Sequence, residues 1–148
     1  LDRDAARVRP GARAGVRVHV MLDWFGSDGI EELHGAAMRG AGIEIQRYNP
    51  PRLRSLARLN HRTHRKLLVV DGRIGFTGGV GIADAWRGHA QDPAHWRDNH
   101  YRVEGPAVTQ MQAAFLDNWT TVTGEVLHGE AYLPAVQPAA PRACSSCS

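Results

Sequence analysis

A histidine and a lysine two residues apart are the most chemically informative pair in this 148-residue chain. They begin the run His64-Arg65-Lys66-Leu67-Leu68-Val69-Val70-Asp71, and Gly78-Gly79 follows shortly after it. If the run is a strand, His64 and Lys66 emerge on the same face, because alternate side chains of a strand point the same way. An imidazole can attack phosphorus or move a proton near neutral pH, and an ammonium neutralises non-bridging oxygens. The pair is therefore typical of phosphate chemistry.

The surrounding composition supports an anionic ligand. Lys66 is the only lysine among 18 basic residues, which indicates a position that needs a compact ammonium and not a planar guanidinium. Paired glycines such as Gly78 and Gly79 let backbone N–H groups approach an anion without a Cβ in the way. Arg62 belongs to a cluster of arginines between positions 52 and 65, which is either an anion-attracting rim or a solvated basic loop.

Hydrophobic patterning predicts a strand, a helix and a second strand upstream of the pair. Residues 16–22 alternate between apolar and polar side chains, and residues 43–48 do the same. Between them, Ile30, Leu33, Ala37, Met38 and Ala41 repeat with a helical period, with Asp28 as the expected N-cap and Gly40 and Gly42 at the end. This order predicts a βαβ unit with parallel strands.

The segment that carries the pair is predicted to be a hairpin. Residues 66–70 and 73–77 are short strand-like runs joined by Asp71-Gly72, a dipeptide typical of two-residue hairpin turns. Residues 78–98 are rich in Gly, Asp and His, which indicates a long functional loop with one helical turn.

Downstream of that loop, residues 100–103 are strand-like, and Gly105-Pro106 opens a helix with proline at its first position. The expected buried stripe of this helix consists of Val108, Met111, Phe115 and Trp119.

The chain is predicted to form one domain over residues 16–133, with a poorly ordered leader at 1–15 and a disordered Pro/Ala/Ser-rich tail at 134–148. With 43% hydrophobic and 22% charged residues the composition is that of a soluble globular domain, which excludes global disorder and a disulfide scaffold. No apolar run approaches the length that spans a bilayer. The net charge of +3 suits phosphate, acidic lipid or nucleic acid and does not choose among them.

The motif His64-x-Lys66-x4-Asp71 with its trailing glycines resembles the signature of the phospholipase D superfamily. The flanking segments look like those of the bacterial cardiolipin synthase branch: LDWFGS at 22–27, NHRTHRKLLVVDG at 60–72, FTGGVGIAD at 76–84 and HWRDNHYRVEGPAV at 95–108. The resemblance covers residues 14–133. It implies an α/β fold, a mixed sheet flanked by helices, here as an incomplete half-module.

The resemblance also implies roles for individual residues. His64 would be the nucleophile that forms a phosphohistidine, or the acid that protonates the leaving alcohol, and Lys66 would bind the phosphate. Asp98 falls where the superfamily carries an acid that hydrogen bonds to the motif histidine. Asp71 would give electrostatic support, although an aspartate there is equally a good turn former. Substrate contacts would come from Gly78, Gly79 and Arg62.

The chain departs from the family pattern in three ways. Gly81 replaces an asparagine that contacts phosphate, and the strand and helix that normally precede residues 16–22 are not recognisable. The third departure is that the chain has one motif where cardiolipin synthases have two. One imidazole cannot be both nucleophile and leaving-group acid in the same step. A functional site would therefore need a homodimer or a second half with its own motif.

The leading interpretation is phosphatidyl transfer through a phosphohistidine, with phosphatidylglycerol or another anionic phospholipid as substrate and peripheral attachment to the bacterial cytoplasmic membrane. Two alternatives stay open: a homodimeric phosphodiesterase acting on nucleic acid, which is less favoured, and a non-catalytic remnant that binds an anion or lipid. No cofactor or metal is expected, because His61 and His64 lack further ligands at suitable spacing and Cys144-x-x-Cys147 lacks a second pair.

Overall fold

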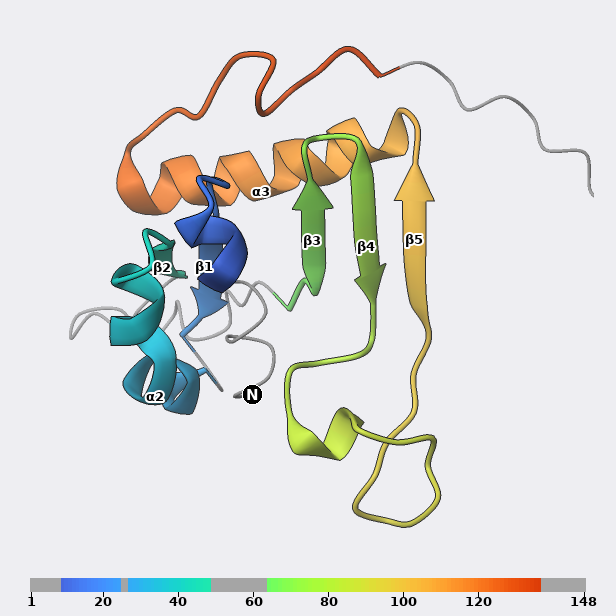
Figure 1. Cartoon of the computed structure of the whole chain (residues 1–148). Coiled ribbons are helices and arrows are strands. Elements are labelled where there is room, and N and C mark those ends of the chain that lie inside the picture. The colour runs from blue at the N-terminus through green and yellow to red at the C-terminus, as the bar shows by residue number, and fades with distance from the viewer. Residues whose placement is uncertain (1–8, 25–26, 49–63, 137–148) are drawn as a thin grey trace, which may run out of the picture.

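The computed structural model describes residues 9–24, 27–48 and 64–136. They form an α/β fold of two small sheets, across which the long helix α3 (Ala107–Thr123) packs against strands of both (Figure 1). This confirms the predicted fold class, and the small sheets with flanking helices are compatible with a phospholipase D-like half-module. A single mixed sheet was expected; within the described residues the strands instead form a parallel pair and a separate antiparallel triplet.

The parallel pair is the predicted βαβ unit. It consists of β1 (His19–Asp23), α2 (Asp28–Arg39) and β2 (Glu44–Tyr48), with His19 opposite Glu44 and Asp23 opposite Tyr48. The helix covers the pair by burying Met38 against Ile43 and Ile45. Three partly buried side chains from the first strand and the residue before it pack on this cluster: Val18, Val20 and Leu22. The strand begins at residue 19 and not at 16, because only from there does the chain pair with β2.

The beginning of α2 differs from the prediction. The N-cap is Ser27 and Asp28 is the first helical residue, so the helix starts one residue earlier than an Asp28 cap would require. Ser27 is buried and its hydroxyl donates to the carbonyl of Asp23, which ties the helix start to the end of β1. The C-terminal end at Gly40 agrees with the expected glycine stop. The side chains of Asp28 and Leu33 lie outside the described residues.

The expected leader is described from residue 9 onward. Residues 9–13 are helical, and Ala12 packs against the cluster around Ile43. This part of the leader therefore has regular structure, which its sequence pattern did not predict. At the other end of the chain, residues 134–136 have no regular structure, and the expected disordered tail beyond them lies outside the described residues.

The antiparallel triplet is β3 (Leu67–Val70), β4 (Ile74–Gly78) and β5 (His100–Glu104), in the order β3-β4-β5. Asp71 and Gly72 have φ of 51° and 62°, so both central residues of the β3–β4 turn are left-handed. Left-handed backbone at both positions is the geometry of a type I′ turn, which matches the twist of a hairpin, and the Arg73 N–H donates to the Val70 carbonyl at 3.0 Å. The register pairs Val70 with Ile74, so three residues connect the strands where two were expected. The predicted hairpin is confirmed.

The segment between β4 and β5 is a long loop with one 3-10 turn, η2 (Asp84–Trp86), as predicted. After β5, Pro106 caps α3 and precedes its first helical residue. Val108 and Trp119 of the expected stripe are fully buried, while Met111 and Phe115 are half-buried. No helix of the described part is long and apolar enough to cross a bilayer.

Candidate active site around His64 and Lys66

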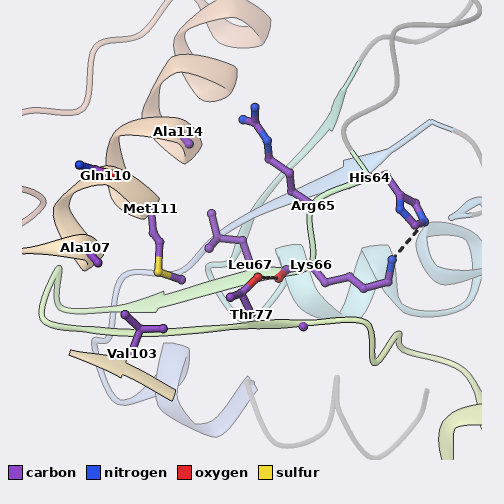
Figure 2. A pocket seen from close by; sticks show the side chains of 11 residues that line it. His64, Arg65, Lys66, Leu67, Thr77, Val103, Ala107, Gln110, Met111 and Ala114 are labelled. Carbon is purple, nitrogen blue, oxygen red and sulfur yellow. Dashed lines mark hydrogen bonds between the residues drawn. The ribbon is translucent and has the colours of Figure 1, made fainter. Parts of the chain in front are cut away.

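His64 and Lys66 lie just before β3, and their side chains meet. Lys66 Nζ is 3.1 Å from His64 Nε2, and the pair is accessible to solvent (Figure 2). An ammonium has only protons to offer, so a charged Lys66 donates and Nε2 accepts through its lone pair. The imidazole proton then sits on Nδ1. This geometry places an imidazole nitrogen directly beside an ammonium. Its lone pair is engaged by Lys66 and becomes available to an electrophile only when the ammonium turns to another acceptor.

The hairpin holds this pair in place through the backbone of Lys66. The hydroxyl of Thr77 donates to the Lys66 carbonyl at 2.9 Å (Figure 2). Leu67 is paired with Thr77 across β3 and β4, so the motif residues emerge where β4 ends at Gly78. The position of His64 and Lys66 at one end of the sheet therefore follows from the register of the hairpin.

Gly78 and Gly79 allow the end of β4 to pack closely against the start of β5. A Cβ on Gly78 would overlap the backbone of Asn99 and His100, and a Cβ on Gly79 would overlap the carboxylate of Asp98. The Gly79 N–H donates to the Asn99 carbonyl at 3.1 Å. Packing against backbone therefore requires a glycine at position 78, whereas at position 79 it favours one as long as the Asp98 side chain stays in place.

Asp98 lies beside Gly79 and does not hydrogen bond to His64 within the described residues. Its Oδ1 accepts from the N–H of Asn99 at 2.6 Å. The hydrogen bond expected from the resemblance is therefore not formed here, because the carboxylate folds back onto the β4 end. The partner of His64 is Lys66.

Asp71 lies at the far end of β3 from the pair. It is five residues beyond Lys66, roughly 16 Å along an extended strand. Its left-handed φ of 51° and its exposed side chain suit a turn former. The structure does not bring Asp71 to His64 and Lys66. The remaining predicted residue, Arg62, lies outside the described residues.

Gly81, where the resemblance leads us to expect an asparagine, lies against an indole ring. A Cβ on Gly81 would come within 2.8 Å of Trp86 Nε1. The missing side chain therefore makes room for Trp86 in the loop after β4. From the sequence alone, the only expected consequence of a glycine at this position is the loss of a contact with phosphate.

A groove runs from the histidine and lysine toward α3. Its volume is about 600 Å³, and Figure 2 shows its polar end at His64 and Lys66 and its apolar walls at Leu67 and Met111. The helix contributes a face that sequence reasoning did not assign to the site, made of Ala107, Gln110, Met111 and Ala114. The spacing of these four residues could have predicted this shared face, because positions three and four residues apart lie on one side of a helix.

A second ordered imidazole lies in the loop between β4 and β5. His95 Nδ1 is 2.7 Å from Asp92 Oδ1, so the carboxylate orients the ring. The His-x-Lys spacing does not indicate this histidine, because its partner is an aspartate three residues earlier. No group of three metal-ligating side chains occurs in the part of the chain that the structure describes.

The sequence was compared with known proteins. It is 40% identical over 123 residues to a cardiolipin synthase of Geobacillus kaustophilus, and 40% identical over 109 residues to cardiolipin synthase 1 of Bacillus anthracis. This similarity relates the chain to part of the bacterial cardiolipin synthases. The two alignments cover 82% and 73% of this chain but only 24% and 21% of the relatives. The chain thus spans about a quarter of the length of the curated relatives it matches.

A third cardiolipin synthase, from Oceanobacillus iheyensis, is 34% identical over 123 residues and is covered to 26% of its length. No protein-family model matches the chain, and no solved structure matches it significantly. The relationship to cardiolipin synthases therefore rests on sequence, and it agrees with the resemblance noted from the motif and its flanks.

Proposed function

We propose that this chain supplies the His64 and Lys66 portion of a phospholipase D-like site that transfers phosphatidyl groups, as in cardiolipin synthesis. The observation that carries the proposal is the 3.1 Å contact between His64 Nε2 and Lys66 Nζ at the accessible end of the hairpin. The similarity to cardiolipin synthases over 82% of the chain supports the choice of substrate class. The donor would be phosphatidylglycerol or another anionic phospholipid.

In the first step, the Lys66 ammonium turns from His64 Nε2 to the non-bridging oxygens of the donor lipid, and the freed Nε2 lone pair attacks the phosphorus. The N–P bond forms, the bond between phosphorus and the glycerol headgroup oxygen breaks, and that oxygen takes a proton from a general acid. Lys66 neutralises the non-bridging oxygens as charge gathers on them. In the second step, the hydroxyl of another phosphatidylglycerol attacks, the N–P bond breaks, and the hydroxyl proton passes to the same acid–base group.

The acid–base group must be a second residue, because His64 is the nucleophile throughout. A second copy of the chain or the remainder of a longer enzyme would supply it. The relatives are about four times as long as the segment they share with this chain, which favours the longer enzyme. The chain alone then supplies the nucleophile and the phosphate-binding lysine, and the acid–base group comes from elsewhere.

The test is transfer from labelled phosphatidylglycerol in vesicles, with His64→Ala and Lys66→Ala beside the wild type. We expect cardiolipin formation, or an acid-labile phosphatidyl adduct on the chain, to fall by at least about a thousandfold in His64→Ala. The matched control is His128→Ala, an exposed histidine beyond α3, which keeps full activity.

Two results would contradict the proposal. One is a wild-type chain that forms neither product nor adduct, alone or with the other part of a cardiolipin synthase. The other is DNA cleavage that disappears in His64→Ala while lipid transfer is absent, which would assign the same pair of side chains to a nucleic-acid phosphodiesterase.

A further inference from the structure

The loop between β4 and β5 has a shape fixed by contacts within it. The Trp96 N–H donates to the Ala85 carbonyl at 2.7 Å and so closes the loop on itself. Arg87 Nε lies 3.1 Å from Asp84 Oδ1 and forms an ion pair across the 3-10 turn. With the Asp92–His95 contact, these bonds define one backbone arrangement for the segment.

This ordered loop nevertheless presents large apolar side chains to solvent. Ile82 is 59% exposed and Trp96 is 54% exposed. The ring of Trp86 supports Trp96 from one side in an edge-on contact, with centroids 5.3 Å apart. The position of Trp96 is therefore held by the loop, and its outer surface is left uncovered within the described part of the chain. Exposed apolar surface of this kind marks an interaction site.

The loop contains both signs of charge, three aspartates and two arginines over residues 79–99, and the charged side chain directly after Trp96 is a cation. Its acidic side chains are engaged inside the loop: Asp84 with Arg87, Asp92 with His95, and Asp98 with the Asn99 N–H. Arg97, which directly follows Trp96, is exposed and has no acidic partner among the described residues. An exposed indole beside an exposed guanidinium suits the boundary between lipid headgroups and acyl chains.

The loop also lies at the reactive end of the molecule. It projects from the end of the sheet where β3 begins and β4 ends (Figure 1). His64 and Lys66 directly precede β3, so they lie at this same end. The phosphate of a phospholipid lies at the bilayer surface, and a protein that reacts with it must turn this end toward the membrane.

We propose that Ile82, Trp86, Trp96 and Arg97, here called the Trp96 surface, form the contact of this protein with bilayers that contain anionic phospholipid. The proposal rests on the proposed function, which supplies the reason for a membrane partner. Ile82 and Trp96 enter the interfacial layer, and Arg97 pairs with headgroup phosphates. The contact holds the reactive end of the hairpin at the depth of the lipid phosphates.

The experiment measures binding of the full chain to vesicles of equal parts phosphatidylglycerol and phosphatidylcholine, and to vesicles of phosphatidylcholine alone. Trp96→Ser and Ile82→Ser are the test variants, and Arg97→Gln tests the charge. Trp96→Ser removes a ring contact with Trp86 and could therefore disturb the loop. Ile82→Ser tests the same surface without that loss, and thermal unfolding of each variant shows whether it is folded. The matched control is Val126→Ser, which alters a side chain 64% exposed beyond α3.

We expect Trp96→Ser and Ile82→Ser each to weaken binding to the mixed vesicles by about three- to tenfold. Arg97→Gln reduces the preference for phosphatidylglycerol, and Val126→Ser binds like the wild type. Brominated lipid quenches wild-type tryptophan fluorescence and quenches Trp96→Phe less. The proposal would be overturned if the wild type did not bind either kind of vesicle, or if the loop variants bound as tightly as the wild type. It would also be overturned if the loop variants changed only the oligomeric state of the protein in solution, which would assign the surface to a protein contact.

Two readouts separate this proposal from the proposed function: phosphatidyl transfer reports on His64, and vesicle binding of the Ile82→Ser and Trp96→Ser variants reports on the Trp96 surface. If the wild type performs no phosphatidyl transfer but its vesicle binding still depends on Trp96 and Ile82, the catalytic proposal fails and the surface stands as a lipid contact. If transfer depends on His64 while vesicle binding is insensitive to the loop, the surface proposal fails alone.

Discussion

The carboxylate of Asp98 lies against the backbone of Gly79, at the place where any other residue would carry its Cβ. The neighbouring Gly78 is crowded in a different way, by the backbone of Asn99 and by His100. A short side chain such as Asp98 can rotate away, whereas the backbone of a paired strand cannot move without breaking its ladder. The two glycines therefore differ in how much a substitution costs.

Gly78→Ala is expected to destabilise the fold by about 2 kcal/mol, and Gly79→Ala by about 1 kcal/mol or less. The double variant Gly79→Ala/Asp98→Ala lacks the obstructing carboxylate, so it should recover the stability lost in Gly79→Ala. No such second substitution can relieve Gly78→Ala, because the obstruction there is backbone. Urea unfolding measures these differences. Gly29→Ala in α2, where a Cβ would meet nothing, serves as the control and leaves stability unchanged or slightly higher. Equal costs at positions 78 and 79 would contradict the difference in crowding.

Asp98→Asn tests whether the carboxylate acts on His64. Since Asp98 bonds to the Asn99 N–H and not to the imidazole, the substitution keeps the contact between His64 and Lys66. We expect phosphatidyl transfer to fall by less than about tenfold, against the much larger loss in His64→Ala. The pH profile of transfer should keep its shape. A loss as large as that of His64→Ala would show that Asp98 turns toward the imidazole when substrate binds.

Asp71 is expected to matter for the turn and not for the reaction. Asp71→Asn keeps a residue that tolerates a φ of 51°, so stability and transfer stay near the wild type. Asp71→Val places a β-branched side chain in the left-handed region and costs about 1–2 kcal/mol. Thermal unfolding and transfer per folded molecule are the measurements. Asp71→Asn with normal stability but abolished transfer would restore a chemical role to this carboxylate.

The hydrogen bond between His19 and Tyr132 ties the segment after α3 to β1. The Tyr132 hydroxyl lies 3.1 Å from His19 Nε2, and the imidazole packs edge-on against Trp119 at 4.9 Å. Tyr132→Phe removes the hydrogen bond and leaves the imidazole partly buried, so we expect a loss of about 1 kcal/mol in the free energy of unfolding. Tyr101→Phe is the control, since that ring is 58% exposed. Equal values for the two variants would show that the bond to His19 contributes nothing.

Local pattern accounts for the parts of the structure that were predicted correctly. The alternation before and after α2 and the turn residues Asp71 and Gly72 act over a few neighbouring positions. The same holds for the contact between His64 and Lys66, which are only two residues apart in the segment just before β3. The stripe of α3 also followed from spacing alone, with Val108 and Trp119 fully buried.

The exact bounds of the elements and the grouping of the strands into sheets could not be predicted from local sequence patterns. The start of β1 depends on where β2 offers a partner, and the capping of α2 depends on the contact of Ser27 with the end of β1. Periodicity cannot show whether two strands pair, since pairing is decided by contacts between distant segments. The division into two sheets among the described residues is of this kind.

The sequence by itself determined the candidate pair His64 and Lys66, its place before a hairpin and the family resemblance, because these depend on residue types at short and fixed spacing. Only the tertiary structure decided that Asp98 rests on Gly79, that Gly81 makes room for Trp86 and that α3 lines the groove beside Lys66. It also placed Tyr132 on His19, 113 residues away. Such contacts join side chains that no local rule relates, and they form only when the hydrophobic core brings the elements together.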